Sequence, residues 1–354
     1  MNVNEKPLRD FVTTIFVAAG CDKDESDCVA DHLVESNLAG HDSHGVIRIA
    51  TYVRWLGEEK VVAGAALETV FDSDVIAVLD GHMGLGQVMA RRAMRLGIEK
   101  CGASGVAVIA LRNCGHMGRI GHWAEMAADS GFVSLHFVNT NGLGVLVAPT
   151  GGISRRLSAN PVAVGIPIAG GQPIIYDIST STVAEGKIRV ALNKGTTVPD
   201  GCLIDAEGRP TNDPKVFYGN GSPPGAILPF GGHKGYGLGI VADILAGALT
   251  GGGCSAPGAT RLEQSMLTVL LKPDAFAGDD AFAAEVKRFV EFVKSSEKVS
   301  PDAQILMPGE IEQQTRAARR AAGIPLDETT WGQIVEVCNT VSVPQSLVDA
   351  VVQD

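Results

Sequence analysis

Residues 40–53 combine groups suited to proton transfer with a group suited to anion binding. If this segment is helical, His44, Arg48 and Tyr52 recur every four residues and share one face, opposite an apolar stripe. Arginine binds a carboxylate through paired hydrogen bonds, and histidine exchanges a proton near neutral pH. In the first turn of a helix, the positive dipole end would also lower the pKa of His44. The spacing favours an acid–base group beside a carboxylate-binding group, but an exposed polar helix face fits it equally well.

A second histidine, His116, lies between Gly115 and Gly118, just after the strand-like run Val106–Ala110. Glycine permits tight turns and close backbone approach, so this histidine could meet a ligand where a strand leads into a helix. A plain turn, in which the ring bonds only to nearby backbone, is the more common explanation for one such motif.

Two further motifs could hold parts of a dinucleotide. The run Pro229–Leu238 contains His233 and Lys234 at the expected start of a helix, where free N–H groups, the dipole and a lysine suit a pyrophosphate. Residues 174–181 place Asp177 and several hydroxyl groups at a strand end, where they could hold a ribose or simply form a local turn. The P-loop spacing is absent from the sequence, and no G-x-G-x-x-G motif follows a strand, so the ordinary Rossmann fingerprint is missing.

The elements that must position these groups follow from the apolar pattern. Residues 1–60 have helical spacing, with one helix ending near Gly20, a second beginning at an Asp24 cap and a third running from about Asp42 to Leu56. Later helical patterns occupy residues 235–249, 280–295 and 310–322, and β-branched runs predict strands at 75–79, 106–109, 132–135 and 174–176. The sequence thus predicts an α/β or α+β body that carries a small helical unit built from both termini.

Composition limits the class of protein. A chain of 354 residues suggests about two domains, and 45% apolar with 19% charged residues is typical of a folded globular protein. Acidic residues outnumber basic ones by 40 to 29, with no basic run, so no nucleic-acid partner is expected. Seven cysteines without a Cys-x-x-Cys pair, and a start without an apolar leader, indicate reduced thiols in a cytoplasm. The most apolar stretch, residues 235–253, is interrupted by Asp243, so no membrane partner is expected.

Seven motifs, in order along residues 42–310, resemble those of the malate/L-lactate dehydrogenase family of the second type. That family includes ureidoglycolate, sulfolactate and diketogulonate oxidoreductases and the cyclic ketimine reductases. The motifs that carry the resemblance are Asp42-Ser43-His44-Gly45-Val46 with Arg48 and Tyr52, Gly115-His116-x-Gly118, Ser158-Ala159-Asn160-Pro161, Asp177-Ile178-Ser179-Thr180-Ser181, Glu185-Gly186-Lys187-Ile188, Pro229-x-Gly231-Gly232-His233-Lys234-Gly235-Tyr236-Gly237 and Met307-Pro308-Gly309-Glu310. The resemblance implies a non-Rossmann α/β fold, in which a mixed, mainly antiparallel sheet binds NAD or NADP. It also implies hydride transfer between nicotinamide and a small 2-hydroxy or 2-oxo acid, in a homodimer with shared active sites.

Residue by residue, the resemblance implies a cofactor site, a substrate site and a domain division. The implied cofactor contacts are Thr140, Asp177, Ile178, Ser179, His233, Lys234, Pro308, Gly309 and Glu310. The implied substrate contacts are Arg48, which would bind the carboxylate, and Tyr52, Asn160, Glu185 and Gly186. The implied division is a helical terminal unit (residues 1–70 and 310–354), an α/β substrate-side region (71–125 and 255–309) and a cofactor-binding mixed-sheet domain (126–254).

The acid–base residue differs among members of the family. In some it is the histidine at position 44, supported by Ser43, and in others it is the histidine at position 116. Lys187 stands where the ketimine reductases have the aspartate that completes a relay with Ser43 and His44. We therefore expect His116 to transfer the proton, with His44 beside Arg48 as an orienting group or second acid.

Three other functions stay open at this point. A reductase of cyclic ketimines or of larger oxo acids would belong to the same family, although Lys187 argues against imine reduction. A metal-dependent hydrolase or lyase could use His41, His44, His116 and His122, but the sequence has no His-Glu-x-x-His motif and we expect no metal site. The third alternative is a homologue that binds a ligand without turning it over.

Overall fold

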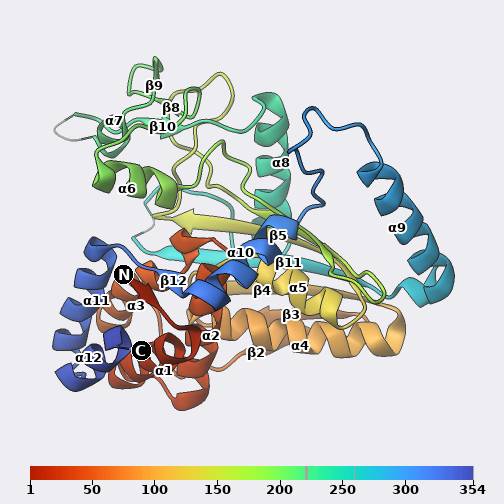
Figure 1. Ribbon diagram of the computed structural model, residues 1–354, viewed down its shortest axis with the longest axis horizontal. Helices are drawn as coiled ribbons and strands as arrows, with labels where there is room; N and C mark the ends of the chain where they lie inside the picture. The colour runs from red at the N-terminus through yellow and green to blue at the C-terminus, as the bar shows by residue number, and fades with distance from the viewer. Residues whose placement is uncertain (220–221, 259, 354) are drawn as a thin grey trace.

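A single seven-stranded sheet forms the centre of the protein in the computed structural model, which describes residues 1–219, 222–258 and 260–353 (Figure 1). The strands follow the order β2-β3-β4-β11-β5-β6-β7; β3 and β4 pair in parallel, and the other neighbours pair antiparallel. Their bounds are β2 (Glu68–Asp72), β3 (Ile76–Asp80), β4 (Val106–Cys114), β5 (Val133–Gly142), β6 (Val162–Ile166), β7 (Ile174–Ile178) and β11 (Leu262–Leu271). The prediction of a mixed, mainly antiparallel sheet is therefore confirmed.

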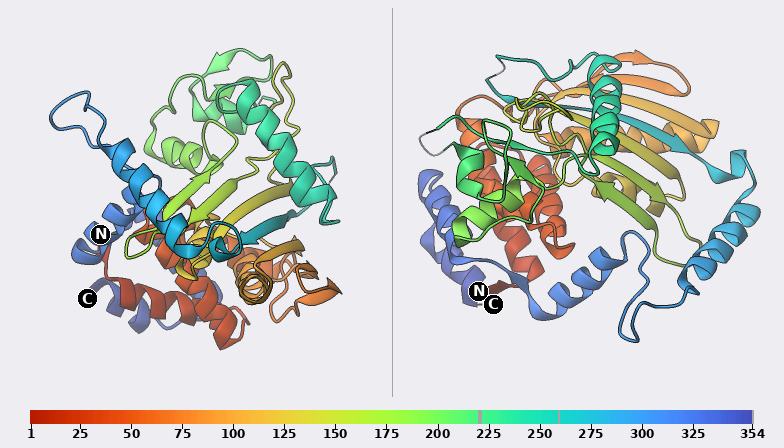
Figure 2. Two further views of the ribbon diagram at one scale, coloured as in Figure 1. Left: turned by 90° about the vertical axis from the view of Figure 1, so that its right-hand side faces the viewer. Right: turned by 90° about the horizontal axis from the view of Figure 1, so that it is seen from above.

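Helices cover both faces of this sheet, as Figures 1 and 2 show. Helices α4 (Gly86–Ser104) and α5 (Gly121–Asp129) pack on one face, and α8 (His233–Asp243) packs on the other. The last turn after α8, η3 (Ile244–Ala248), is π-helical, so the helix predicted at 235–249 exists but changes its hydrogen-bond pattern at its end. Among the described residues, no helix is both long and apolar enough to cross a bilayer.

The two ends of the chain meet in one helical unit, as predicted (Figure 2). Strand β1 (Asn2–Val3) pairs with β12 (Ile324–Pro325) and ties the termini together. The helices of the unit are α1 (Glu5–Ala18), α2 (Lys23–Leu38), α3 (Ile49–Gly57), α10 (Glu310–Ala322), α11 (Glu328–Thr340) and α12 (Gln345–Gln353). The cap of α2 is Asp22 and not Asp24 as predicted, because the Asp22 carboxylate accepts the N–H of Glu25 at 2.7 Å.

The single helix predicted from Asp42 to Leu56 is wrong. The segment forms two short 3₁₀ turns, η1 (Asp42–His44) and η2 (Val46–Arg48), before α3 begins. Between them, Gly45 is extended, and a side chain there would collide with Asn37, whose amide oxygen accepts the N–H of Val46 at 2.8 Å. In a continuous helix, the N–H of Val46 would donate to a backbone carbonyl. Here it donates to the Asn37 side chain instead, and the chain changes direction at Gly45.

A smaller unit packs beside the helical unit and the sheet (Figure 1). It contains a three-stranded sheet, in the order β10-β8-β9, and its own apolar core around Ile188 and Phe217. Its elements are α6 (Glu185–Lys194), β8 (Leu203–Ile204), β9 (Pro210–Thr211), α7 (Pro214–Tyr218) and β10 (Ala226–Ile227). The start of α6 lies so close to η1 that a side chain on Gly186 would come within 2.5 Å of Ser43 Cβ.

Two features bear on the predicted organisation. Strands β4 and β11 share one continuous sheet with β5, β6 and β7, so the sheet crosses the boundary expected near residue 126, and the division of this body into two regions stays a prediction. After the short turn η4 (Pro273–Ala275), helix α9 (Asp279–Lys294) stands apart from the sheet, as Figure 1 and the right-hand view of Figure 2 show.

Candidate active site

The two candidate acid–base histidines lie face to face. The rings of His44 and His116 are stacked, with centroids 5.5 Å apart and planes inclined by 17°. His44 ends η1, and His116 lies in the loop between β4 and α5. The Ser43 hydroxyl lies 3.1 Å from His44 Nδ1, as expected for a supporting group. The structure thus brings together two histidines that are 72 positions apart in the chain, 116 minus 44.

Both histidines are neutral in this environment. Burial, with a smaller contribution from the Arg48 charge, lowers the pKa of His116 to about 3. Burial also lowers the pKa of His44 well below its ordinary value, helped by His116 and Arg48. The helix dipole predicted to act on His44 is not the cause, since the residue lies in a single 3₁₀ turn and burial has the largest effect.

Arg48 lies beside the histidine pair, and the two terminal nitrogens of its guanidinium group are available to a ligand. Its Nε donates to the Ser43 carbonyl oxygen at 2.6 Å, which fixes the direction of the guanidinium. Its two terminal nitrogens form no hydrogen bond or ion pair within the described ranges of the chain. A half-buried guanidinium with unused donors is suited to a carboxylate ligand.

Tyr52 contacts His116 directly. Its hydroxyl oxygen lies 2.6 Å from His116 Nδ1 and accepts a hydrogen bond from Gln87 Nε2 at 3.0 Å. Because Gly45 breaks the predicted helix, Tyr52 does not share a helical stripe with His44 and Arg48 as the spacing suggested. It reaches the site from α3 instead, and its hydroxyl is already bound to the histidine.

Glu185 brings a carboxylate close to Arg48 from the start of α6. Its Oε1 accepts hydrogen bonds from Arg189 at 2.6 Å and from the Tyr218 hydroxyl at 2.7 Å. Burial opposes its ionisation, but the charges of Arg189 and Arg48 hold the pKa of Glu185 below its ordinary value. Gly186, next to it, permits the close approach of α6 to Ser43. Both expected substrate contacts in α6 therefore lie against the His44 segment.

Three of the four expected cofactor motifs meet along β7. The Pro308 carbonyl accepts the N–H of Ile175 at 3.0 Å, and Gly309, with φ of +97°, lies directly over that residue. Ile178 ends the same strand and pairs with Val162 of β6. At the far end, the N–H of Phe230 donates to Thr180 at 3.1 Å, which joins the start of α8 to the strand end.

Asp177 and Ser179 occupy the end of β7. Asp177 Oδ2 accepts the N–H of Gly121 at 2.8 Å, while its other oxygen forms no hydrogen bond with the residues that the structure describes. Burial raises the pKa of Asp177, although Arg119 opposes this effect. The Ser179 hydroxyl lies 2.5 Å from the hydroxyl of Ser181. One carboxylate oxygen is thus left to bind a hydroxyl group.

The start of α8 offers exposed backbone donors. Gly231 and Gly232 have φ of +55° and +61°, and the open space around Gly232 would admit a ligand. His233 and Lys234 follow in the first turn and are exposed. A side chain at Gly235 would collide with backbone oxygens, so glycine there allows α8 to approach the end of β7. The arrangement fits an anion at a helix N-terminus.

Thr140 on β5 is linked to the histidine site by a residue that the sequence analysis missed. Gln264, on the neighbouring β11, donates to the Thr140 hydroxyl at 2.8 Å and accepts the N–H of Met117 at 2.6 Å. Gln264 is 5% exposed. A polar glutamine within the apolar sequence of β11 could have indicated that Gln264 has a role in the site. Gln87, which lies near the start of α4 among apolar residues, could have been recognised in the same way.

Asn160 is fully buried behind Thr140. Its Oδ1 accepts the Thr140 N–H at 3.3 Å, and its Nδ2 donates to Gly239 at 3.0 Å and to Asp243 at 3.1 Å. Both Nδ2 hydrogens are thus used within the protein, while Oδ1 accepts one hydrogen bond and has a second lone pair. Asn160 positions Thr140, and its expected substrate contact stays a prediction.

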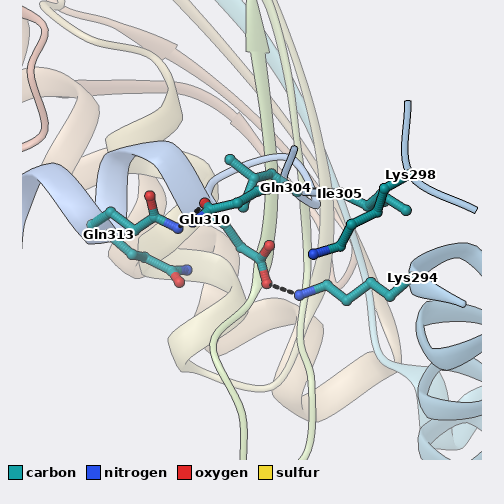
Figure 3. Close-up of a pocket in the computed structure, with 8 residues that line it drawn as sticks. Lys294, Lys298, Gln304, Ile305, Glu310 and Gln313 are labelled. Atoms are coloured by element: carbon teal, nitrogen blue, oxygen red, sulfur yellow. Dashed lines mark hydrogen bonds and ion pairs between the residues drawn. The ribbon is translucent and has the colours of Figure 1, made fainter. Parts of the chain in front are cut away.

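Glu310 lies in a pocket of about 450 Å³ between the end of α9 and the start of α10 (Figure 3). Its carboxylate forms an ion pair with Lys294 and accepts the N–H of Met307 at 3.0 Å. Lys298 also lines the pocket. The expected cofactor contact of Glu310 is thus accompanied by two lysines, which sequence reasoning did not include.

Within the described ranges, no group of three or more His, Cys, Asp or Glu side chains is placed to hold a metal ion. His41 is bound to Glu312 at 3.1 Å, and His122 packs against His32 and Trp123.

Comparison with known proteins gives consistent results. The sequence model of the family described as malate/L-lactate dehydrogenase matches residues 3–335. Hydroxycarboxylate dehydrogenase B of Escherichia coli strain K12 is 41% identical over 353 residues, which cover 98% of this chain and 96% of that protein. L-lactate dehydrogenase of Cupriavidus necator is 36% identical over 347 residues, covering 97% and 99%. The solved structure of sulfolactate dehydrogenase from Methanocaldococcus jannaschii matches with a TM-score of 0.86 at 30% identity, covering 99% of this chain and 100% of that chain.

Proposed function

Because the chain belongs to the malate/L-lactate dehydrogenase family, we propose that it interconverts a small 2-hydroxy acid and its 2-oxo acid with NAD or NADP. The observation that carries this proposal is the free guanidinium fork of Arg48 beside the stacked rings of His44 and His116. Such a group fits a substrate that has a carboxylate next to the reacting carbon. The bound nicotinamide supplies the hydride in reduction and accepts it in oxidation.

The residues of this chain divide the remaining work. Arg48 binds the substrate carboxylate and so holds C2 next to His116. His116 exchanges a proton with the substrate oxygen, and the stacked His44, supported by Ser43, helps to orient that oxygen. Holding the reacting atoms in this geometry can contribute about 7–11 kcal/mol to lowering the barrier.

The residues along β7 and α8 fit a dinucleotide. The exposed first turn of α8, with Lys234, suits the pyrophosphate, and the free oxygen of Asp177 suits a ribose hydroxyl. Ile178, Ser179 and the turn at Pro308–Gly309 lie along β7, and Thr140 lies on β5, two strands away. Together with Glu310 they complete the proposed cofactor contacts. Either NAD or NADP is compatible with these groups.

The experiment that tests the function is a matrix of substrates and cofactors, followed at the nicotinamide absorbance. Oxaloacetate, pyruvate, an aryl-pyruvate and a cyclic imine are each assayed with NADH and with NADPH, with and without a chelator. We expect oxidation of reduced cofactor with at least one small oxo acid, unaffected by chelation. Cofactor binding without turnover would favour a ligand-binding homologue, and preference for the imine would favour ketimine reduction.

We further propose that the protein is a cytoplasmic homodimer with shared active sites. Helix α9 supports a second copy as its partner, since none of its residues is buried and Phe289 and Phe292 are 51% and 68% exposed. Large exposed aromatic side chains on one helix mark an interaction surface. The seven cysteines are free thiols, which suits a reducing compartment.

A further inference from the structure

The hydrogen bonds around His116 define which ring nitrogen carries its proton. Nδ1 lies 2.6 Å from the Tyr52 hydroxyl and also accepts the backbone N–H of Gly118 at 3.3 Å. A backbone N–H can only donate, so Nδ1 must present its lone pair. The neutral ring therefore carries its proton on Nε2.

Gln87 sets the direction of the Tyr52 hydroxyl. Its amide nitrogen donates to the phenol oxygen at 3.0 Å, so the phenol proton is directed to His116 Nδ1. Tyr52 and Gln87 are 3% and 1% exposed, so water does not compete freely for these bonds. The chain Gln87 to Tyr52 to His116 runs in one direction from α4 through α3 to the loop after β4.

We propose that Tyr52, held by Gln87, is a positioning residue that keeps His116 as the Nε2–H tautomer and exchanges a proton with its Nδ1 during the reaction. This inference rests on the proposed oxo-acid reduction. It differs from the substrate contact expected for Tyr52, because the hydroxyl acts through the histidine.

The proton transfers balance without a charged histidine. In reduction, His116 gives its Nε2 proton to the substrate oxygen, and the dinucleotide, when bound, would supply the hydride to C2. The phenol proton moves to Nδ1 at the same time, so the Nε2–H and Tyr52 O–H bonds break while the substrate O–H and Nδ1–H bonds form. His116 ends as the neutral Nδ1–H tautomer and Tyr52 as a phenolate, which accepts hydrogen bonds from Gln87 and His116. Oxidation follows the reverse path.

The surroundings support this route. Burial lowers the pKa of His116 to about 3, so an imidazolium is not the resting proton donor. Burial raises the pKa of Tyr52 to about 12, so the neutral phenol is its resting form, and the smaller opposing effects of Arg48 and Gln87 lessen the cost of a transient phenolate. Among the described residues, the charged and titratable groups that act on the pair are Arg48, His44 and His32. A cavity of about 10 Å³ beside Tyr52, Gln87 and His116 has room for roughly one water. The cycle closes when the Nδ1 proton returns to the phenolate and Nε2 takes a proton from solvent, which restores the Tyr52 O–H and the Nε2–H tautomer.

The first test measures the tautomer without any turnover. The full-length protein is labelled with ¹⁵N-histidine, and the His116 signals are identified by their loss in His116→Gln. We expect the nitrogen shifts of an Nε2–H imidazole from pH 5 to pH 9. Tyr52→Phe, which keeps the ring, should shift the Nδ1 signal because the phenol bond is lost. A wild-type signal of the Nδ1–H tautomer, or no response to Tyr52→Phe, would overturn the proposal.

The second test measures the pH profile of kcat/KM for reduction. In the wild type, the profile should be flat from pH 5 to 9, because the proton donor is a neutral pair. In Tyr52→Phe, the proton must come through an imidazolium, so kcat should fall by about 10²-fold or more at pH 8 and kcat/KM should drop about tenfold per pH unit. KM for the oxo acid should change less than threefold. Gln87→Met should give a smaller loss, roughly threefold to tenfold, with the same change in shape.

Thr69→Val is the control for loss of a hydroxyl group, since Thr69 is exposed on β2 and has no part in the proposed machinery. Equal pH profiles for Tyr52→Phe and the wild type would overturn the relay, whatever the size of the rate change. If no oxo acid is reduced by the wild type, the proposed function fails, while the tautomer measurement still tests the geometry of Tyr52 and His116.

Discussion

The amide nitrogen of Gln264 donates a hydrogen bond to the Thr140 hydroxyl over 2.8 Å. The same side chain accepts the N–H of Met117, the residue after His116, at 2.6 Å. One buried amide on β11 therefore connects Thr140 on β5, a proposed cofactor contact, to the loop that carries His116. A displacement of either partner is transmitted to the other through two hydrogen bonds.

Gln264→Met should remove the hydrogen bonds of Gln264 to both Thr140 and Met117. It leaves the Met117 N–H and the Thr140 hydroxyl buried without partners, which we expect to lower the free energy of unfolding by about 1–3 kcal/mol. In kinetics, KM for the cofactor should rise and kcat should fall, because the His116 loop is no longer held. Gln333→Met on the exposed side of α11 is the control. Urea unfolding and steady-state assays check the result. An unchanged free energy of unfolding together with unchanged kcat and KM would show that Gln264 does not support the site.

Arg48→Ala should reduce kcat/KM for 2-oxo acids about tenfold to 150-fold, because a charge-assisted bond to a carboxylate contributes about 1.5–3 kcal/mol. The effect should appear mainly in KM if binding of the carboxylate is the same in the ground and transition states. An aldehyde or ketone without the carboxylate should be used equally by wild type and variant. The control is Arg54→Ala, an exposed arginine on α3. An unchanged kcat/KM would remove Arg48 from the substrate site.

His116→Ala should abolish most turnover, about 10² to 10⁴-fold, while cofactor affinity is retained. His44→Ala should have the smaller effect, because we assign His44 to orientation of the substrate oxygen. Steady-state rates and cofactor titration by fluorescence separate the two variants, with the exposed His82→Ala as control. If His44→Ala is the more damaging substitution, the assignment of the acid–base residue is reversed.

Much of the site could be predicted from sequence, but only where residue type and local spacing decide the result. Arg48 and His44 are four residues apart and meet His116 at one place in the structure, as expected. Tyr52 was predicted to share their helical face, yet Gly45 and Asn37 interrupt the helix. A partner 8 positions upstream, 45 minus 37, thus overrides the local helical pattern.

The contributions of Gln87 and Gln264 could not be predicted, because their partners are remote in sequence. Gln87 bonds to a residue 35 positions away, and Gln264 bonds across 147 and 124 positions. The fold shows the same limit. Apolar spacing located α10 at its observed bounds, Glu310–Ala322, but pairing of β11 between β4 and β5 depends on contacts that no local pattern records.

Stability should fall in mild acid because of buried neutral histidines, of which His136 gives a clear test. Its ring is fully buried between Thr268 and Ser134, and burial lowers its pKa to about 3. The unfolded chain binds a proton near pH 6.5, whereas the folded protein does not until about pH 3. The contribution of His136 is therefore fully present above pH 6.5 and is lost as the pH falls, by about 2 kcal/mol at pH 5.

His136→Gln should make the free energy of unfolding less dependent on pH between 5 and 7.5, because glutamine keeps a polar group but does not titrate. Urea unfolding at each pH measures the difference between the two proteins. His233→Gln is the control and should follow the wild-type curve, because the His233 side chain is exposed on the first turn of α8. Parallel curves for His136→Gln and wild type would contradict the argument.

The exposed aromatic face of α9 makes the dimer testable. Phe289→Lys combined with Phe292→Lys should change the mass in light scattering from two chains to one, since lysine does not tolerate burial in an apolar interface. The fold should be unaffected because these side chains bury little area within the protomer, and circular dichroism would verify this. Glu291→Lys, which also adds positive charge to α9, should remain dimeric. If the active sites are shared, activity should fall with dissociation. A wild type that is already monomeric, or a double variant that keeps the mass of a dimer, would show that α9 does not join two copies.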